Sequence, residues 1–174
     1  EGLHLSVNLS ARTLADSGFV DQVAQRCGRH GVAPERLMFE LTETAAMEDP
    51  VGSLALLTRL RMKGFKLSID DFGTGFSSML QLVRLPFSEV KVDRSFVASV
   101  PTSKESQAVV RSIIDLGHSL GLTVAAEGVE DAATLDFLLQ AGCDLAQGYL
   151  IARPLGPALV QPWLDARWPP PEQI

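Results

Sequence analysis

The sequence predicts an α/β fold, built as about six units of a TIM-like parallel (β/α) barrel. Six runs of strand-forming apolar residues each lead to a loop and then to a segment of helical periodicity. Each run ends in polar or charged residues that suit metal or phosphate chemistry, namely Asn8, Glu40, Asp70 with Asp71, Lys91, Glu127 and Gln147. The carboxyl ends of parallel barrel strands meet on one face, so we expect these side chains to converge.

The predicted strands are short apolar runs. The first and third alternate apolar and polar residues with period two, whereas the fifth is nearly continuously apolar, as expected for a strand covered on both faces. In chain order the strands comprise residues 3–8, 37–40, 65–71, 90–93, 122–127 and about 145–151.

The predicted helices show apolar residues at helical spacing and end at glycine or proline. Asp16 or Ser17 is available to cap the first helix, Pro50 opens the second, and residues 104–120 have the most regular pattern. In chain order the helices lie within 17–31 and 50–64, through 79–83, over 104–120, through 135–139 and through 159–164. Six units do not close an eight-stranded barrel, which typically needs ~200 residues or more.

Composition restricts the classes of function. A chain of 174 residues that is 46% hydrophobic forms one domain with a substantial core. The formal net charge of −6 argues against binding of a nucleic acid polymer and suggests that a metal bridges any anionic ligand. No apolar run reaches the ~18 residues of a membrane span. We interpret Cys27 and Cys143 as buried thiols rather than a disulfide, which suits a reducing cytosol.

Several short strings occur together over almost the whole chain. They are residues 6–10 (SVNLS), 39–43 (FELTE), 70–75 (DDFGTG), 91–93 (KVD), 126–130 (AEGVE), 147–149 (QGY) and 153–155 (RPL). In this order they resemble the EAL domain, the metal-dependent phosphodiesterase of bacterial cyclic di-GMP signalling. The Glu-Ala-Leu motif of that family belongs upstream of Glu1. The resemblance therefore implies an N-terminally truncated EAL domain over residues 1–168, followed by a Pro-rich tail over 169–174.

The resemblance also implies a two-metal site. Asn8, Glu40 and Asp70 match the family's ligands to one metal, while Asp71 and Glu127 match positions near the second and also count among the catalytic residues. We expect two Mg²⁺ or Mn²⁺ ions, because carboxylate and amide oxygens suit these cations. Two such ions about 3.5 to 4 Å apart activate water and neutralise charge on a phosphodiester.

Other matches surround this site. Lys91 matches the family's lysine beside the attacking water, and Gln147 matches a polar residue that completes the pocket. Residues that match loop-holding or supporting positions are Glu43, Gly73, Gly75 and Glu130.

Each residue taken alone has an ordinary structural explanation. The Asp pair can cap a helix that starts near Ser77, Asn8 suits a turn, and Lys91 can pair with Asp93 on the same strand. Independent surface residues would scatter between both ends of a barrel. The coincidence of six suitable strand ends therefore favours the functional interpretation.

Three functional hypotheses remain. The first is a phosphodiesterase that converts cyclic di-GMP to linear pGpG, and the retained metal-ligand matches favour it. The second is a catalytically inactive cyclic di-GMP receptor, and the third is an unrelated metal-dependent barrel such as an aldolase-like enzyme. The expected partners are cyclic di-GMP, an upstream regulatory domain in the parent protein and a second copy in a homodimer. The expected location is the cytoplasm.

Overall fold

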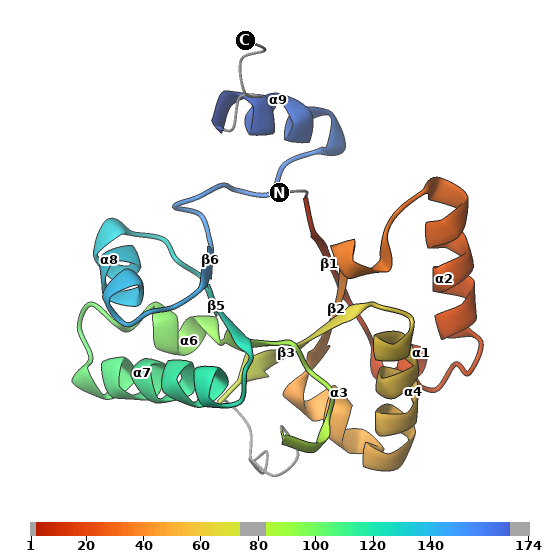
Figure 1. Ribbon diagram of the computed structural model, residues 1–174. Helices are drawn as coiled ribbons and strands as arrows, with labels where there is room; N and C mark the ends of the chain where they lie inside the picture. The colour runs from red at the N-terminus through yellow and green to blue at the C-terminus, as the bar shows by residue number, and fades with distance from the viewer. Residues whose placement is uncertain (1–2, 74–82, 168–174) are drawn as a thin grey trace.

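Six parallel strands form one sheet in the computed structural model, which describes residues 3–73 and 83–167 (Figure 1). In order across the sheet they are β1 (Leu5–Asn8), β2 (Leu37–Thr42), β3 (Lys66–Phe72), β4 (Glu89–Val92), β5 (Thr123–Glu127) and β6 (Leu145–Gln147). Each strand neighbours the next one in the sequence, as in a (β/α) barrel. The predicted fold class, about six βα units of a TIM-like barrel, is confirmed.

Helices cover the convex side of this curved sheet, except for the last helix, which lies apart from it, as Figure 1 shows. The helices are α1 (Ala11–Leu14), α2 (Phe19–His30), α3 (Glu43–Glu48), α4 (Pro50–Met62), α6 (Arg94–Val97), α7 (Lys104–Ser119), α8 (Ala132–Gln140) and α9 (Pro157–Arg167), with a short 3₁₀ turn over Pro34–Arg36. The hydrophobic core lies between strands and helices. Within it the Phe39 ring makes T-shaped contacts with Phe19 and Phe65, with ring centroids 5.6 and 5.4 Å apart.

The strand register places the predicted chemistry on the concave side. Asn8 pairs with Glu40, and Glu127 pairs with Gln147. Three further pairs connect the other strands. Glu40 pairs with Ser68, two residues before Asp70, and Ser68 pairs with Glu89, two residues before Lys91. Lys91 pairs with Ala125, two residues before Glu127. Residues two apart on a strand share a face, so all of these side chains belong to one inward-facing set.

An irregularity in β3 coincides with the acidic pair. Ile69 pairs with Val90 and Phe72 pairs with Val92, so β3 holds one residue more than β4 between these two pairs. Asp71 has φ of 57°, and it is the only residue other than glycine with positive φ in residues 3–73 and 83–167. A bulge of this kind re-aims side chains, which would alternate between faces in a regular strand.

Element boundaries test the sequence-based predictions in detail. The predicted helix over 104–120 is confirmed as α7, whose cap Ser103 accepts a hydrogen bond from the Ser106 N–H at 3.0 Å. The predicted cap of α2 by Asp16 or Ser17 is wrong. The N-cap is Gly18, and the Asp16 side chain accepts from the Gly18 N–H at 2.8 Å within the preceding turn.

Two other predictions differ in extent. The segment before Pro50, expected to be a loop, contains α3, whose cap Thr42 accepts from the Ala45 N–H at 3.2 Å. The predicted sixth strand over about 145–151 is too long, because β6 ends at Gln147. Gly75, most of the predicted helix through 79–83 and the predicted tail over 169–174 lie outside the described residues.

Candidate active site

Carboxylates from three strands surround one lysine at the carboxyl ends of β2 to β5. Carboxylate oxygens of Asp70, Asp71 and Glu127 lie within 4.8 Å of one another. The Lys91 Nζ lies 3.0 Å from Glu40 Oε2 and 3.8 Å from Asp70 Oδ1, and it also contacts Glu127 Oε1. The structure thus brings together five of the predicted site residues in one cluster.

Lys91 is the centre of this cluster, and its side chain is only 4% exposed. Burial alone lowers the pKa of a lysine. Here the hydrogen bond and charge of Glu127, followed by the charge of Asp70 and a hydrogen bond to Glu40, outweigh burial and raise the pKa of Lys91 above its ordinary value. The ammonium group is therefore charged at neutral pH.

The surrounding carboxylates experience opposing influences. Burial raises the pKa of Glu127, although Lys91 acts in the opposite direction. Burial also raises the pKa of Asp71, and the negative charges of Asp70 and Asp93 add to this effect. Like charges this close to one another favour either a proton or a bound cation.

Asp93 belongs to the cluster in a way that the sequence did not indicate. The proposed pairing of Lys91 with Asp93 is replaced by the three carboxylate contacts described above. The Asp93 side chain instead caps α6 by accepting from the Ser95 N–H at 2.9 Å, and its negative charge contributes to the raised pKa of Asp71. Its position at the end of the predicted fourth strand, before a polar helix start, was the available signal.

Another buried carboxyl, Glu89, lies on the concave face. Glu89 is 5% exposed and stands two residues before Lys91 on β4, with its side chain on the same side of the sheet. Burial raises its pKa. The predicted strand begins at Val90 and so leaves Glu89 out. The period-two relation to Lys91 was the signal that would have identified it.

The loop after the acidic pair is tied to α3. The Gly73 N–H donates to Glu43 Oε2 at 3.3 Å, and the Glu43 side chain is buried. Gly73 has φ of 99°, and a Cβ there would lie 3.3 Å from both Ile113 and Phe96. Glycine is favoured at this position by conformation as well as by space.

Three predicted site residues lie at the margin. Asn8 and Gln147 are exposed, and each is level with a cluster residue, Glu40 or Glu127, on the neighbouring strand. Glu130 points elsewhere, because its carboxylate pairs with Arg94 at 2.8 Å on the surface. The structure therefore does not bring Glu130 into contact with Lys91 or its partners.

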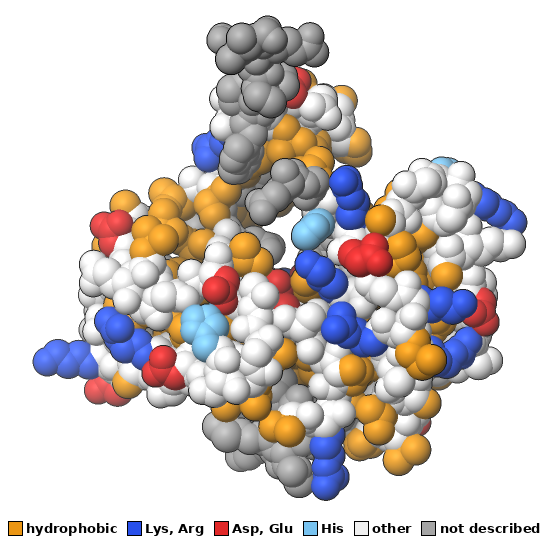
Figure 2. Space-filling model, in the orientation of Figure 1, with side chains coloured by type: hydrophobic (Ala, Val, Ile, Leu, Met, Phe, Trp, Pro, Cys, Tyr) orange, Lys and Arg blue, Asp and Glu red, His pale blue; other side chains and the backbone are white. Residues whose placement is uncertain are grey.

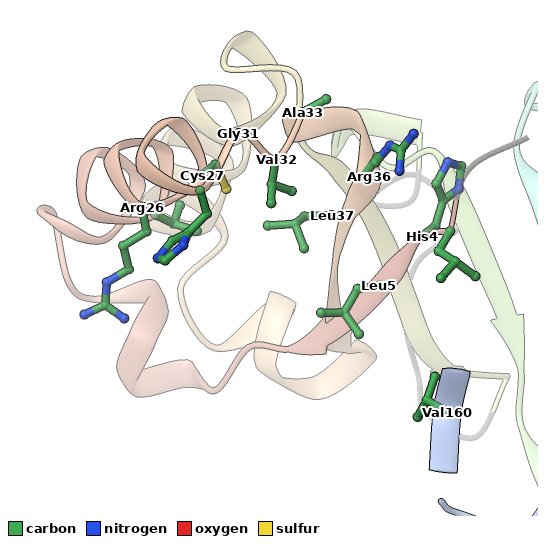
Figure 3. Close-up of a pocket in the computed structure, with 13 residues that line it drawn as sticks. His4, Leu5, Arg26, Cys27, Gly31, Val32, Ala33, Arg36, Leu37 and Val160 are labelled. Carbon is green, nitrogen blue, oxygen red and sulfur yellow. The ribbon is translucent and has the colours of Figure 1, made fainter. Parts of the chain in front are cut away.

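A separate groove of about 870 Å³ lies beside β1 (Figure 3). Its labelled residues come from the start of β1 and the residue before it, from α2, from the segment between α2 and β2, from the first residue of β2, and from α9, which contributes Val160. Hydrophobic side chains also gather on the surface near β6 and α9, including Leu145, Leu150 and Leu159 (Figure 2). None of the predicted strand-end residues lines the groove, so it is distinct from the candidate active site.

The parallel strands and their helices form part of a (β/α) barrel. Its carboxylates and lysine lie at the carboxyl ends of the strands, where the active sites of (β/α)-barrel enzymes are found. The family model described as "EAL domain" matches residues 1–154. The chain belongs to the EAL domain family. Within residues 3–73 and 83–167, no helix has the length and apolar character needed to cross a bilayer.

Relatives from Pseudomonas aeruginosa include two that are named for cyclic di-GMP chemistry. The chain is 45% identical over 152 residues to the bifunctional diguanylate cyclase/cyclic di-GMP phosphodiesterase MucR, covering 87% of this chain and 22% of MucR. It is 38% identical over 153 residues to the cyclic di-GMP phosphodiesterase RocR, covering 88% of this chain and 39% of RocR. The chain thus spans well under half the length of these curated relatives.

Solved structures show the same fold. The EAL domain of Mycobacterium smegmatis DcpA matches with a TM-score of 0.88 and 36% identity, over 94% of this chain and 73% of that one. A MucR phosphodiesterase in complex with c-di-GMP matches with a TM-score of 0.85 and 43% identity, over 90% and 64%. Klebsiella pneumoniae BlrP1, solved with manganese and cyclic di-GMP, matches with a TM-score of 0.82 and 34% identity, over 87% and 39%.

Proposed function

We propose that this chain forms most of a catalytic EAL domain that hydrolyses cyclic di-GMP to linear pGpG with two Mg²⁺ or Mn²⁺ ions per site. The observation that carries this proposal is the convergence of Glu40, Asp70, Asp71 and Glu127 around Lys91. Support also comes from the relatives MucR and RocR, both named as cyclic di-GMP phosphodiesterases.

The donor set fits a hard divalent cation. Mg²⁺ and Mn²⁺ prefer oxygen ligands, and the closely spaced oxygens of Asp70, Asp71 and Glu127 are of this kind. We assign Asn8, Glu40 and Asp70 to one metal, and Asp71 with Glu127 to the other. The manganese in the BlrP1 complex supports a divalent cation at a site of this family. When bound, such metals supply an activated water and neutralise charge on the phosphodiester.

The chain's own residues position and stabilise the reacting groups. Lys91 offers a positive charge, in a setting nearly shielded from water, to the negative charge that develops on the phosphate. Gln147, level with Glu127, offers an amide to the ligand. Glu43 fixes the loop after the acidic pair through the Gly73 N–H. We retain loop and supporting roles for Gly75 and Glu130, the latter through its surface pair with Arg94.

The proposal extends to the parent protein. Residues 1–168 act as the EAL domain, and 169–174 act as a Pro-rich tail. An upstream regulatory domain controls activity, in keeping with the small share of MucR that this chain spans. The protein acts in the cytoplasm on bacterial second-messenger signalling, and it works as a homodimer.

The test is conversion of cyclic di-GMP to pGpG, followed by liquid chromatography in Mn²⁺ or Mg²⁺. It compares this chain, its Glu40→Gln variant and a version extended upstream through the Glu-Ala-Leu motif. We expect metal-dependent turnover that the substitution abolishes in whichever form is active. Binding of cyclic di-GMP without turnover in both forms would favour the receptor hypothesis. Metal binding without affinity for cyclic di-GMP would favour an unrelated metal-dependent barrel.

A further inference from the structure

The carboxylates at the site already have a cation of the chain's own. The Lys91 ammonium contacts Glu40, Asp70 and Glu127, which are carboxylates from three different strands. All three belong to the proposed metal ligands. The same oxygens are therefore required by Lys91 in this structure and by divalent ions in the proposed function.

A carboxylate oxygen cannot serve both cations at full strength. The Lys91 and Glu40 side chains are 4% and 8% exposed, so water screens their attraction only weakly. Lysine carries a compact charge on a flexible four-carbon stem, which permits its ammonium group to move several ångströms while its backbone stays in β4.

We propose that Lys91 is a tethered cation that competes with divalent metal ions for Glu40 and Glu127 and leaves them when metal binds. This inference rests on the proposed function, because it concerns the same site. Before metal binds, Lys91 holds mutually repelling carboxylates together. When metal displaces it, the freed ammonium group faces the region where the phosphate is bound. Binding of the metal and movement of the Lys91 ammonium group toward the phosphate are then a single step.

Lys66 provides a matched control. It lies on β3 four residues before Asp70, on the same concave face, and lines a cavity of about 190 Å³ below the site with Glu89 and Ser88. Among the ion pairs of residues 3–73 and 83–167, Lys66 makes none with the site carboxylates. Substitution of Lys66 thus removes an inward-facing positive charge without removing a competitor.

The experiment measures Mn²⁺ affinity by calorimetry for the wild type, Lys91→Met and Lys66→Met. We expect Lys91→Met to bind Mn²⁺ at least about tenfold more tightly, a change equivalent to about 1.4 kcal/mol, and Lys66→Met to change affinity by less than about threefold. Melting in EDTA should show Lys91→Met to be less stable than the wild type, with a larger gain on adding Mn²⁺. Lys91→Gln replaces Lys91→Met should the latter fail to fold.

A direct measurement follows the ammonium group itself. Acetylation of Lys91, read by mass spectrometry against Lys66 in the same sample, should increase when Mn²⁺ is added. Equal Mn²⁺ affinity in Lys91→Met and the wild type, equal gains in the two lysine variants, or unchanged Lys91 labelling would each overturn the proposal. Tighter Mn²⁺ binding in Lys91→Met, with no turnover in any form, would support exchange and count against the phosphodiesterase alone.

Discussion

Gly148 lies where two segments of backbone approach closely, and replacing it with alanine tests the packing beside the site. A Cβ at this position would lie 2.1 Å from the Val129 carbonyl oxygen and 2.3 Å from the Val129 nitrogen. Two hydrogen bonds join the same segments: Val129 N–H donates to Gln147 O, and Leu150 N–H donates to Val129 O, both at 3.0 Å. Backbone atoms cannot rotate away as a side chain can, so the segments must separate.

The structure sets the size of the effect. Overpacking costs about 1 to 3 kcal/mol, and weakening two hydrogen bonds adds about 1 kcal/mol each, so Gly148→Ala should cost about 3 to 5 kcal/mol of unfolding free energy. At about 2 to 4 °C per kcal/mol for a domain of this size, the melting temperature should fall by about 6 to 20 °C.

Urea and thermal denaturation provide the assay, with Gly28→Ala as the matched control. Gly28 lies inside α2, and a Cβ added there would have no other heavy atom within 4 Å beyond its own helix backbone. Alanine there should raise stability by about 0.5 to 1 kcal/mol, because glycine is a poor helix former. A Gly148→Ala protein that melts at or above the wild-type temperature would refute this reasoning about the close approach.

Three further predictions concern stability and thiol chemistry. Leu60→Ala should cost about 2 to 5 kcal/mol in urea denaturation, because Leu60 is fully buried, and a smaller loss would mean that the core collapses around the cavity. Slight burial raises the pKa of Asp144, but hydrogen bonds from the Val124 N–H and His118 outweigh this effect and lower the pKa below its ordinary value. Asp144 therefore stabilises the fold above about pH 4 and loses this effect as pH falls through its lowered pKa. The stability gap between the wild type and Asp144→Asn should narrow below about pH 4, and a constant gap would contradict the assignment. Burial raises the pKa of Cys143 to about 11, so a thiol reagent at neutral pH should react with it slowly until urea unfolds the chain, and rapid native labelling would exclude this environment.

Much of the fold follows from local patterns. The long amphipathic segment and Gly121 defined α7 to within one residue of its observed end, because helical periodicity over many residues carries a strong signal. The parallel arrangement of strands followed from their alternation with helices. Convergence of Glu40, Lys91 and Glu127 followed in turn, because parallel strands of a barrel end on one face.

Contacts between distant segments account for what the sequence left open. The direction of Glu130 depends on Arg94, which lies 36 residues away, and not on the neighbours of Glu130 in the chain. β6 ends at Gln147, where the next residue, Gly148, packs against the backbone of Val129. The choice of Lys91 between Asp93 and three carboxylates on other strands depends on strand register, which no single segment encodes.

Under the proposed function, in which Asp71 holds a metal ion, the bulge in β3 sets stability against activity at a single residue. Asp71 adopts a left-handed conformation that costs an L-residue about 1 to 2 kcal/mol, although aspartate tolerates it better than most. Glycine at this position would remove the strain together with one of the two adjacent carboxylates. Laboratory selection for heat resistance alone should therefore enrich glycine at position 71 and yield variants that are more stable but lack the proposed phosphodiesterase activity. Selection for turnover should preserve the strained aspartate across otherwise divergent libraries.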